Sequence, residues 1–149
     1  MKRRILLVDD DLAVLLTLKA VLELHGFEVE TAASTTEAFL RIESSSYHMV
    51  ISDLRMETED AGLEVIRAAR RQSYSPATAL LTAFPPSEDY VDGENPNNKE
   101  RPDSLLIKPL GTKDLVRQVE ALLVRHADKQ QLLASDPPSQ TRLRNRSAG

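Results

Sequence analysis

An apolar run that ends in three aspartates, ILLVDDD at residues 5–11, decides the fold. The arrangement recurs twice, because Asp53 follows the run Met49–Ser52 and Lys108 follows the run Leu105–Ile107. Short apolar runs that alternate with helical patterns are typical of buried parallel strands. In an open α/β sheet, ligands bind beyond the carboxyl ends of such strands. We therefore expect these carboxylates and the lysine to meet at one sheet edge, as a site for a divalent cation and a phosphate group.

Strands and helices are predicted to alternate along the chain. The predicted strands cover residues 4–9, 27–32, 48–52, 76–82 and 104–107. Asp11 can cap a first helix that stops near Gly26, and the capping box STTE at residues 34–37 opens a second helix. Two further helices are predicted at about residues 62–72 and 112–126, and the last of them can run on through Leu132 and Leu133. This alternation predicts an α/β fold in which helices cover both faces of a parallel sheet.

Composition sets the broad class of the protein. With 149 residues, of which 41% are hydrophobic and 28% are charged, the chain suits one soluble domain. The net charge of -4 argues against nucleic-acid binding by the domain itself, and the absence of cysteine excludes disulfides and thiolate metal sites. The first apolar run is too short for a signal peptide, and no stretch approaches membrane-spanning length. We therefore expect a cytoplasmic protein without membrane contact.

Four short strings carry a resemblance to a known family. They are LVDDD at residues 7–11, SDLRM at residues 52–56, LTA at residues 81–83 and KPL at residues 108–110. In this order and at these element ends, they resemble the receiver domain of bacterial two-component response regulators over residues 3–126. The resemblance implies a flavodoxin-like, doubly wound, five-stranded parallel sheet with strand order 2-1-3-4-5.

The resemblance also implies a role for each residue of the expected site. Asp53 would accept the phosphoryl group and bind Mg²⁺, Asp10 would bind the metal directly, and Asp9 would bind it directly or through water. The backbone carbonyl of Arg55 would complete the metal ligands that the protein supplies. A carboxylate attacks a phosphoryl group poorly because both are negative, so catalysis depends on positioning and on charge neutralisation. Mg²⁺ suits this task because it prefers hard oxygen ligands.

Two further catalytic residues are implied on the neighbouring strands. Lys108 would offer a compact positive charge to the phosphoryl oxygens. Thr82 would offer a hydroxyl donor that follows the phosphate once it has arrived. Because crowded carboxylates repel one another, we expect a raised pKa on at least one of them, or a looser site, when no metal is bound.

Other interpretations of the same residues stay open. Asp11 is better explained as a helix cap than as a metal ligand. The spacing of Asp9 and Asp11 also matches a phosphatase of the haloacid-dehalogenase type, but Ala13 stands where that motif has threonine, and Asp53 would be unexplained. A degenerate receiver could instead bind a partner without being phosphorylated. Retention of Asp10, Asp53, Thr82 and Lys108 together argues against that alternative.

Two segments depart from the pattern of the family. Residues 57–62 lack the proline that the family often has there, and they make a turn one residue longer. Residues 85–103 are polar and contain four prolines, so we predict a loop or one short turn in place of the fourth helix. The family's switching aromatic falls at Leu105. We therefore expect an unconventional output surface, in which phosphorylation could order residues 84–103.

We predict a receiver domain at residues 1–127, followed at residues 128–149 by a C-terminal helix extension and a disordered, basic tail. A receiver that stands alone is the simplest architecture. The resemblance implies that a sensor histidine kinase or a histidine phosphotransfer protein donates the phosphoryl group, and that an unknown downstream protein receives the signal. Homodimerisation stays open.

Overall fold

The computed structural model describes residues 2–83, 102–108 and 111–135, and these residues form one parallel sheet with helices on both faces. The sheet has five strands in the order β2-β1-β3-β4-β5. Their bounds are Arg4–Val8 (β1), Glu28–Ala32 (β2), Met49–Asp53 (β3), Ala77–Thr82 (β4) and Ser104–Ile107 (β5). The predicted fold class and strand order are confirmed.

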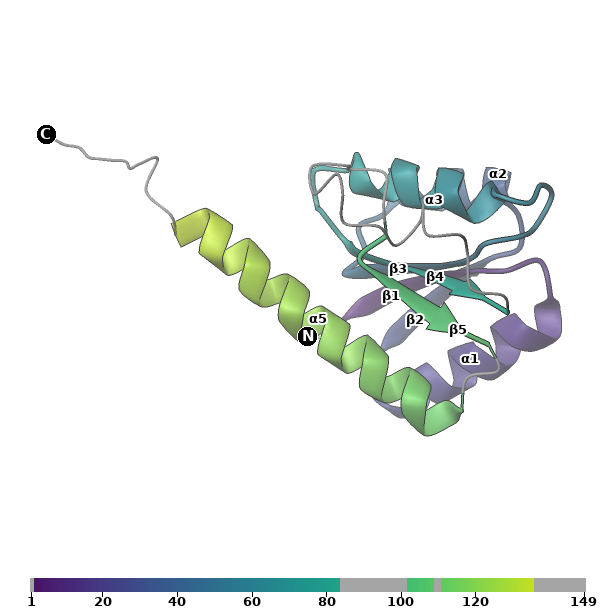
Figure 1. Ribbon diagram of the computed structural model, residues 1–149, viewed down its shortest axis with the longest axis horizontal. Coiled ribbons are helices and arrows are strands. Elements are labelled where there is room, and N and C mark those ends of the chain that lie inside the picture. The colour runs from purple at the N-terminus through teal and green to yellow at the C-terminus, as the bar shows by residue number, and fades with distance from the viewer. Residues whose placement is uncertain (1, 84–101, 109–110, 136–149) are drawn as a thin grey trace, which may run out of the picture.

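The described helices lie in two layers. Their bounds are Leu12–Leu24 (α1), Thr35–Ser44 (α2), Ala61–Arg70 (α3) and Thr112–Ser135 (α5). Helices α1 and α5 cover one face of the sheet, and α2 and α3 cover the other (Figure 1). Helix α5 runs on beyond His126, and its last turns project from the body of the domain (Figure 1). The predicted loop at residues 84–101 and the predicted tail at residues 136–149 lie outside the described residues.

Each face of the sheet has its own aliphatic core. Successive side chains of a strand point to opposite faces, so Ile5 and Leu7 of β1 face α1 and α5, whereas Leu6 and Val8 face α2 and α3. One core contains, among others, Leu15, Leu22, Leu115 and Val119 from the helices, and the other contains Ala38, Ile42, Val65 and Ala69. Burial on both faces explains why the central strands are continuous apolar runs.

The helix ends follow the capping signals of the sequence. Asp11 Oδ1 accepts hydrogen bonds from the backbone N–H groups of Ala13 at 3.0 Å and Val14 at 3.3 Å, so Asp11 is the N-cap of α1. Gly26 follows the end of α1 with φ of 93°, a conformation that glycine adopts without a steric penalty. Ser34 caps α2 by accepting from the backbone N–H of Glu37 at 3.1 Å. The predicted helix starts at Asp11 and Ser34 are confirmed.

The register of the sheet brings the strand ends to one edge. Val8 of β1 pairs with Ser52 of β3, and Thr82 of β4 pairs with Ile107 of β5. The residues that follow these strands therefore share the carboxyl edge of the sheet. Within the described ranges, none of the helices combines the length and apolar character needed to cross a membrane.

Candidate functional site

The turn after β1 holds one aspartate inside the protein and leaves the next at the surface. The backbone N–H of Asp9 donates to Ala32 O at 3.1 Å, and this contact extends the ladder between β1 and β2 by one residue. The Asp9 side chain is only 3% exposed, and its Oδ1 accepts from the backbone N–H of Asp11 at 3.0 Å. Asp10 is exposed. The two carboxylates thus reach the site from inside and from solvent.

Three carboxylates converge at this edge. One oxygen each from Asp9, Asp10 and Asp53 lies within 4.8 Å of the other two. Around an octahedral Mg²⁺, ligands on opposite sides are about 4.2 Å apart and adjacent ligands are about 3.0 Å apart, because each Mg²⁺–oxygen distance is about 2.1 Å. At most two of the three oxygens can lie opposite each other, so the carboxylates would have to move closer together to share one ion. This all-oxygen set, open to water on the side of Asp10, fits Mg²⁺ and offers no soft ligand.

Lys108 follows β5, the strand at one edge of the sheet, and its side chain reaches the carboxylates. Its Nζ donates to Asp9 Oδ2 at 3.3 Å and to Asp53 Oδ1 at 3.2 Å. Burial by itself disfavours the charge on this lysine, but the carboxylates of Asp9 and Asp53 outweigh burial and raise the pKa of Lys108. The charged form of Lys108 is therefore favoured, and its ammonium lies between two of the three carboxylates.

The surroundings of Asp53 disfavour the charge of its carboxylate. Its side chain is 13% exposed. Burial and the neighbouring carboxylate of Asp9 raise the pKa of Asp53, with a smaller contribution from Asp10, and the ammonium of Lys108 opposes the rise without cancelling it. The pKa values of both partners of the Asp53–Lys108 pair are thus raised, because the lysine faces two carboxylates and must divide its charge between them. This crowding of negative charge favours the binding of a further cation.

The remaining predicted residues flank this cluster. Thr82 is the last residue of β4 and is buried, and its backbone carbonyl accepts from the backbone N–H of Lys108 at 2.7 Å. Arg55 lies two residues beyond Asp53 in the exposed loop before α3. The fold therefore brings Asp9, Asp10, Asp53 and Lys108 into one cluster, with Thr82 and Arg55 on the segments beside it.

Comparison with known proteins agrees with this geometry. The model of the response regulator receiver domain matches residues 5–120 of this chain. The chain belongs to this family. Receiver domains are signalling domains, and the four strings that suggested the resemblance all lie within the matched residues.

Individual relatives place this receiver among response regulators. It is 35% identical over 124 residues to the transcriptional regulatory protein CpxR homolog of Haemophilus influenzae, an alignment that covers 83% of this chain and 52% of the relative. The chain thus spans about half the length of the curated relatives it matches.

Solved structures share the fold. A CheY-like receiver domain protein from Methanospirillum hungatei superimposes with a TM-score of 0.75 at 26% identity, covering 87% of this chain and 99% of that one. The chemotaxis protein CheY4 of Vibrio cholerae superimposes with a TM-score of 0.72 at 25% identity, covering 82% and 99% of the two chains.

One residue that shapes the receiver site escaped the sequence analysis, which treated Gly62 only as a helix start. A Cβ at Gly62 would lie 2.2 Å from the backbone oxygen of Asp53 and 2.8 Å from the Cα of Leu54. The backbone N–H of Gly62 also donates to Leu54 O at 2.8 Å. The start of α3 therefore packs directly on the backbone that carries Asp53, and only glycine fits there. The signal in the sequence is a glycine that closes an acidic turn after a strand-end aspartate.

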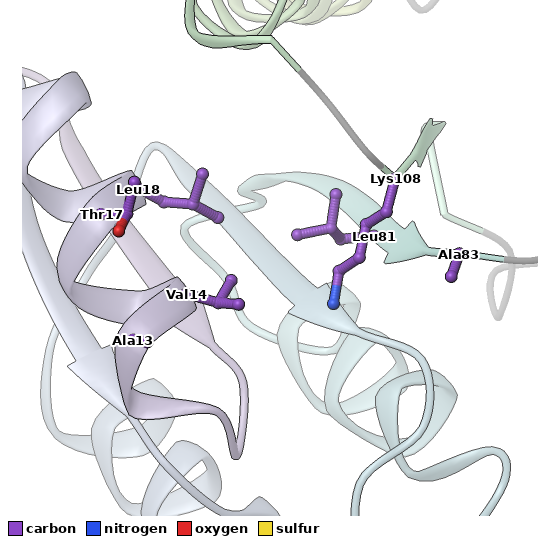
Figure 2. A pocket seen from close by; sticks show the side chains of 7 residues that line it. All are labelled: Ala13, Val14, Thr17, Leu18, Leu81, Ala83 and Lys108. Carbon is purple, nitrogen blue, oxygen red and sulfur yellow. The ribbon is translucent and has the colours of Figure 1, made fainter.

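A hollow of about 630 Å³ opens beside Lys108, on the α1 side of the receiver. Figure 2 shows Val14 and Leu18 of α1 on one side of it, and Leu81 and Lys108 on the other. The lining residues are Ala13, Val14, Thr17, Leu18, Leu81, Ala83 and Lys108. The stem of Lys108 thus borders an apolar space while its ammonium reaches the carboxylates. Residues 109–110, which follow the lysine, lie outside the described residues.

Proposed function

We propose that this receiver accepts a phosphoryl group on Asp53 in a two-component phosphorelay. The observation that carries the proposal is the convergence of the carboxylates of Asp9, Asp10 and Asp53 with the ammonium of Lys108. No requirement of the fold places three like charges within 4.8 Å of one another, and crowding of this kind costs stability. Such strain is typical of a functional site.

The reacting group is a carboxylate oxygen of Asp53. It attacks phosphorus of a phosphohistidine, the P–N bond breaks, and the histidine ring leaves with the electron pair and takes up a proton. Mg²⁺ bound by Asp9, Asp10, Asp53 and the Arg55 carbonyl would supply charge neutralisation during this transfer. The product is an acyl phosphate on Asp53, whose later hydrolysis restores the carboxylate.

Lys108 and Thr82 act on the group that arrives. Lys108 already lies 3.2 Å from Asp53 Oδ1, so a short movement of its flexible stem places the ammonium against a phosphoryl oxygen. The hollow beside the lysine gives that stem room to move. Thr82 ends the adjacent strand, and its hydroxyl would donate to a second phosphoryl oxygen. These new contacts would favour one conformation of the residues around the site.

The partners follow from this chemistry. A sensor histidine kinase or a histidine phosphotransfer protein would be the donor, and a downstream protein would recognise the phosphorylated state. The receiver domain itself would be at residues 1–127, and the extension beyond it begins as a continuation of helix α5. A phosphorelay of this kind would operate in the cytoplasm.

Phosphorylation by a small donor tests the proposal. The protein is incubated with acetyl phosphate and Mg²⁺, and its intact mass is read beside Asp53→Asn and a chelator-treated sample. We expect a gain of one phosphoryl group that requires both Asp53 and Mg²⁺. No gain under conditions that label a known receiver would refute the proposal and leave a phosphorylation-independent binding module. Steady release of phosphate from many substrates would instead indicate a phosphatase.

A further inference from the structure

The loop between β3 and α3 is fixed at its base and turned sharply within. Gly62 closes the base by donating to Leu54 O at 2.8 Å. Inside the loop, the backbone N–H of Met56 donates to Thr58 O at 3.1 Å, so the chain reverses around residue 57. The side chain of Met56 also packs against the core that α2 and α3 share. Glu57 therefore stands at a defined position on the outside of this turn.

From that position, Glu57 binds the N-terminus of α2. Its Oε2 accepts from the backbone N–H of Thr35 at 3.0 Å and from Thr35 Oγ1 at 3.4 Å. The first N–H groups of a helix have no partner within the helix, and they favour a negative charge nearby. Ser34 already satisfies the N–H of Glu37 in the same turn. Glu57 thus supplies, from a loop distant in sequence, the acceptor that Thr35 needs.

This contact lies next to a residue of the metal site. Arg55 is two residues from Asp53 on one side and two residues from Glu57 on the other. Its backbone carbonyl would reach a metal bound by Asp53 only if the loop held one conformation. In the family pattern, a proline often fixes the backbone at position 57. Here a charged hydrogen bond to another element restrains the loop in place of that ring.

We propose that Glu57 is a positioning residue for the divalent cation. Its attachment to α2 holds the loop so that the Arg55 carbonyl can join Asp9, Asp10 and Asp53 around one ion. The inference rests on the proposed function, because it concerns the same metal. It adds that metal affinity depends on a contact with the N-terminus of α2, so that whatever displaces Glu57 from Thr35 weakens metal binding.

The test compares Mg²⁺ binding by calorimetry in the full chain and three variants. Glu59→Ala is the matched control, because Glu59 carries the same charge in the same loop, is exposed, and has no hydrogen bond or ion pair to the described residues. We expect Glu57→Ala to weaken Mg²⁺ binding about fivefold more than Glu59→Ala does. A lost helix-capping hydrogen bond costs about 1 kcal/mol, and this free energy corresponds to about a fivefold change in an equilibrium constant. Glu57→Gln keeps an acceptor oxygen and should recover most of the affinity.

Two further measurements separate positioning from a merely structural role. Thermal unfolding is recorded for each variant, because a structural role alone would lower Tm in Glu57→Ala and leave Mg²⁺ affinity equal to that of Glu59→Ala. Amide hydrogen exchange at Thr35, measured without metal, should accelerate in Glu57→Ala and stay unchanged in Glu59→Ala. Unchanged exchange would refute the contact itself.

The outcomes distinguish this inference from the proposed function. Equal Mg²⁺ affinities in Glu57→Ala and Glu59→Ala would overturn the positioning role, while phosphorylation of Asp53 in the wild-type protein would still support the phosphoacceptor. A wild-type protein that binds no Mg²⁺ would overturn both.

Discussion

At the carboxyl edge of the sheet (the crowded end), the carboxylates of Asp9, Asp10 and Asp53 lie close together and Lys108 pairs with two of them, whereas at the amino ends of β1 and β2 (the paired end) each acid faces a base. There Arg4 forms ion pairs with both Glu28 and Glu30. Glu30 also accepts from the hydroxyl of Tyr47 at 2.7 Å.

The pKa of a carboxylate is shifted in opposite directions at the two ends: it is lowered for Glu30 and raised for Asp53. The Tyr47 hydrogen bond and the Arg4 guanidinium lower the pKa of Glu30 despite partial burial. Burial and Asp9 raise the pKa of Asp53 despite Lys108. Charge stabilises the fold where it is paired, and it is left in excess where a ligand is expected to bind.

The largest effect on stability should come from a substitution at Gly62, which packs against the backbone of Asp53. In Gly62→Ala, the new Cβ would lie 2.2 Å from Asp53 O, so β3 and α3 must move apart. We expect a loss of about 3 kcal/mol in the free energy of unfolding, at the upper end for overpacked sites, together with slower phosphorylation of Asp53. Urea unfolding and acetyl phosphate labelling measure the two effects.

Gly111→Ala is the control for that substitution. Among the described residues, a Cβ there meets nothing nearer than Asp114 Oδ2 at 3.7 Å, so we expect a loss of no more than about 1 kcal/mol, from the poorer helix cap that alanine makes before α5. If Gly62→Ala were as stable as Gly111→Ala, the packing of α3 on the Asp53 backbone would not be rigid.

The sequence was sufficient for the parts of this architecture that rest on local patterns. Apolar runs located the five strands, and the side chains of Asp11 and Ser34 located two helix starts because capping is a contact over two or three residues. The strand order and the roles of Asp53, Thr82 and Lys108 came from the family resemblance, since apolar periodicity carries no information about which strands are neighbours.

Two contacts that support the site depended on distances that no local pattern records. Glu57 reaches Thr35 across 22 residues, and Gly62 packs on the backbone of Asp53. Contacts between polar side chains follow no periodicity, and a glycine at a close approach looks like any turn glycine. The site could therefore be located from the sequence, whereas its supports could not.

The paired end around Arg4, Glu30 and Tyr47 should lose its contribution to folding stability at high pH. Burial and the hydrogen bond to Glu30 raise the pKa of Tyr47 to about 12, above its ordinary value of 10.0. Between these values the unfolded chain releases the proton first, so this contribution is fully present below pH 10 and is lost as pH rises toward 12. Burial also raises the pKa of Tyr74 to about 12, so both tyrosines act in this window.

We expect Tyr47 to contribute about 2 kcal/mol to this loss of stability, since one pKa unit corresponds to about 1.4 kcal/mol. Unfolding free energies at pH 9 and pH 12 give the loss. Tyr47→Phe cannot titrate at this position, so it should show a smaller pH dependence with the part due to Tyr74 remaining. If the pH dependence were unchanged in that variant, ionisation of Tyr47 would not contribute to the loss of stability.

The smallest expected effects come from replacing one carboxylate by an amide at each end of the sheet. We expect the free energy of unfolding to change in opposite directions at the two ends. Glu30→Gln removes a charge that faces Arg4 and Arg41, so we expect stability to fall by about 1 kcal/mol. Asp53→Asn removes a charge that burial and Asp9 disfavour, and it leaves the Lys108–Asp9 pair in place. We expect the metal-free protein to become more stable.

Urea unfolding at pH 7 with a chelator measures both variants under one condition. Added Mg²⁺ should then reverse the order at Asp53, because the wild-type carboxylate gains a ligand that asparagine binds poorly. Loss of stability in both variants without metal would mean that Lys108 compensates the crowded carboxylates fully. The crowding of negative charge at the carboxyl edge would then cost no stability, and only the geometry of the oxygen ligands would favour a cation there.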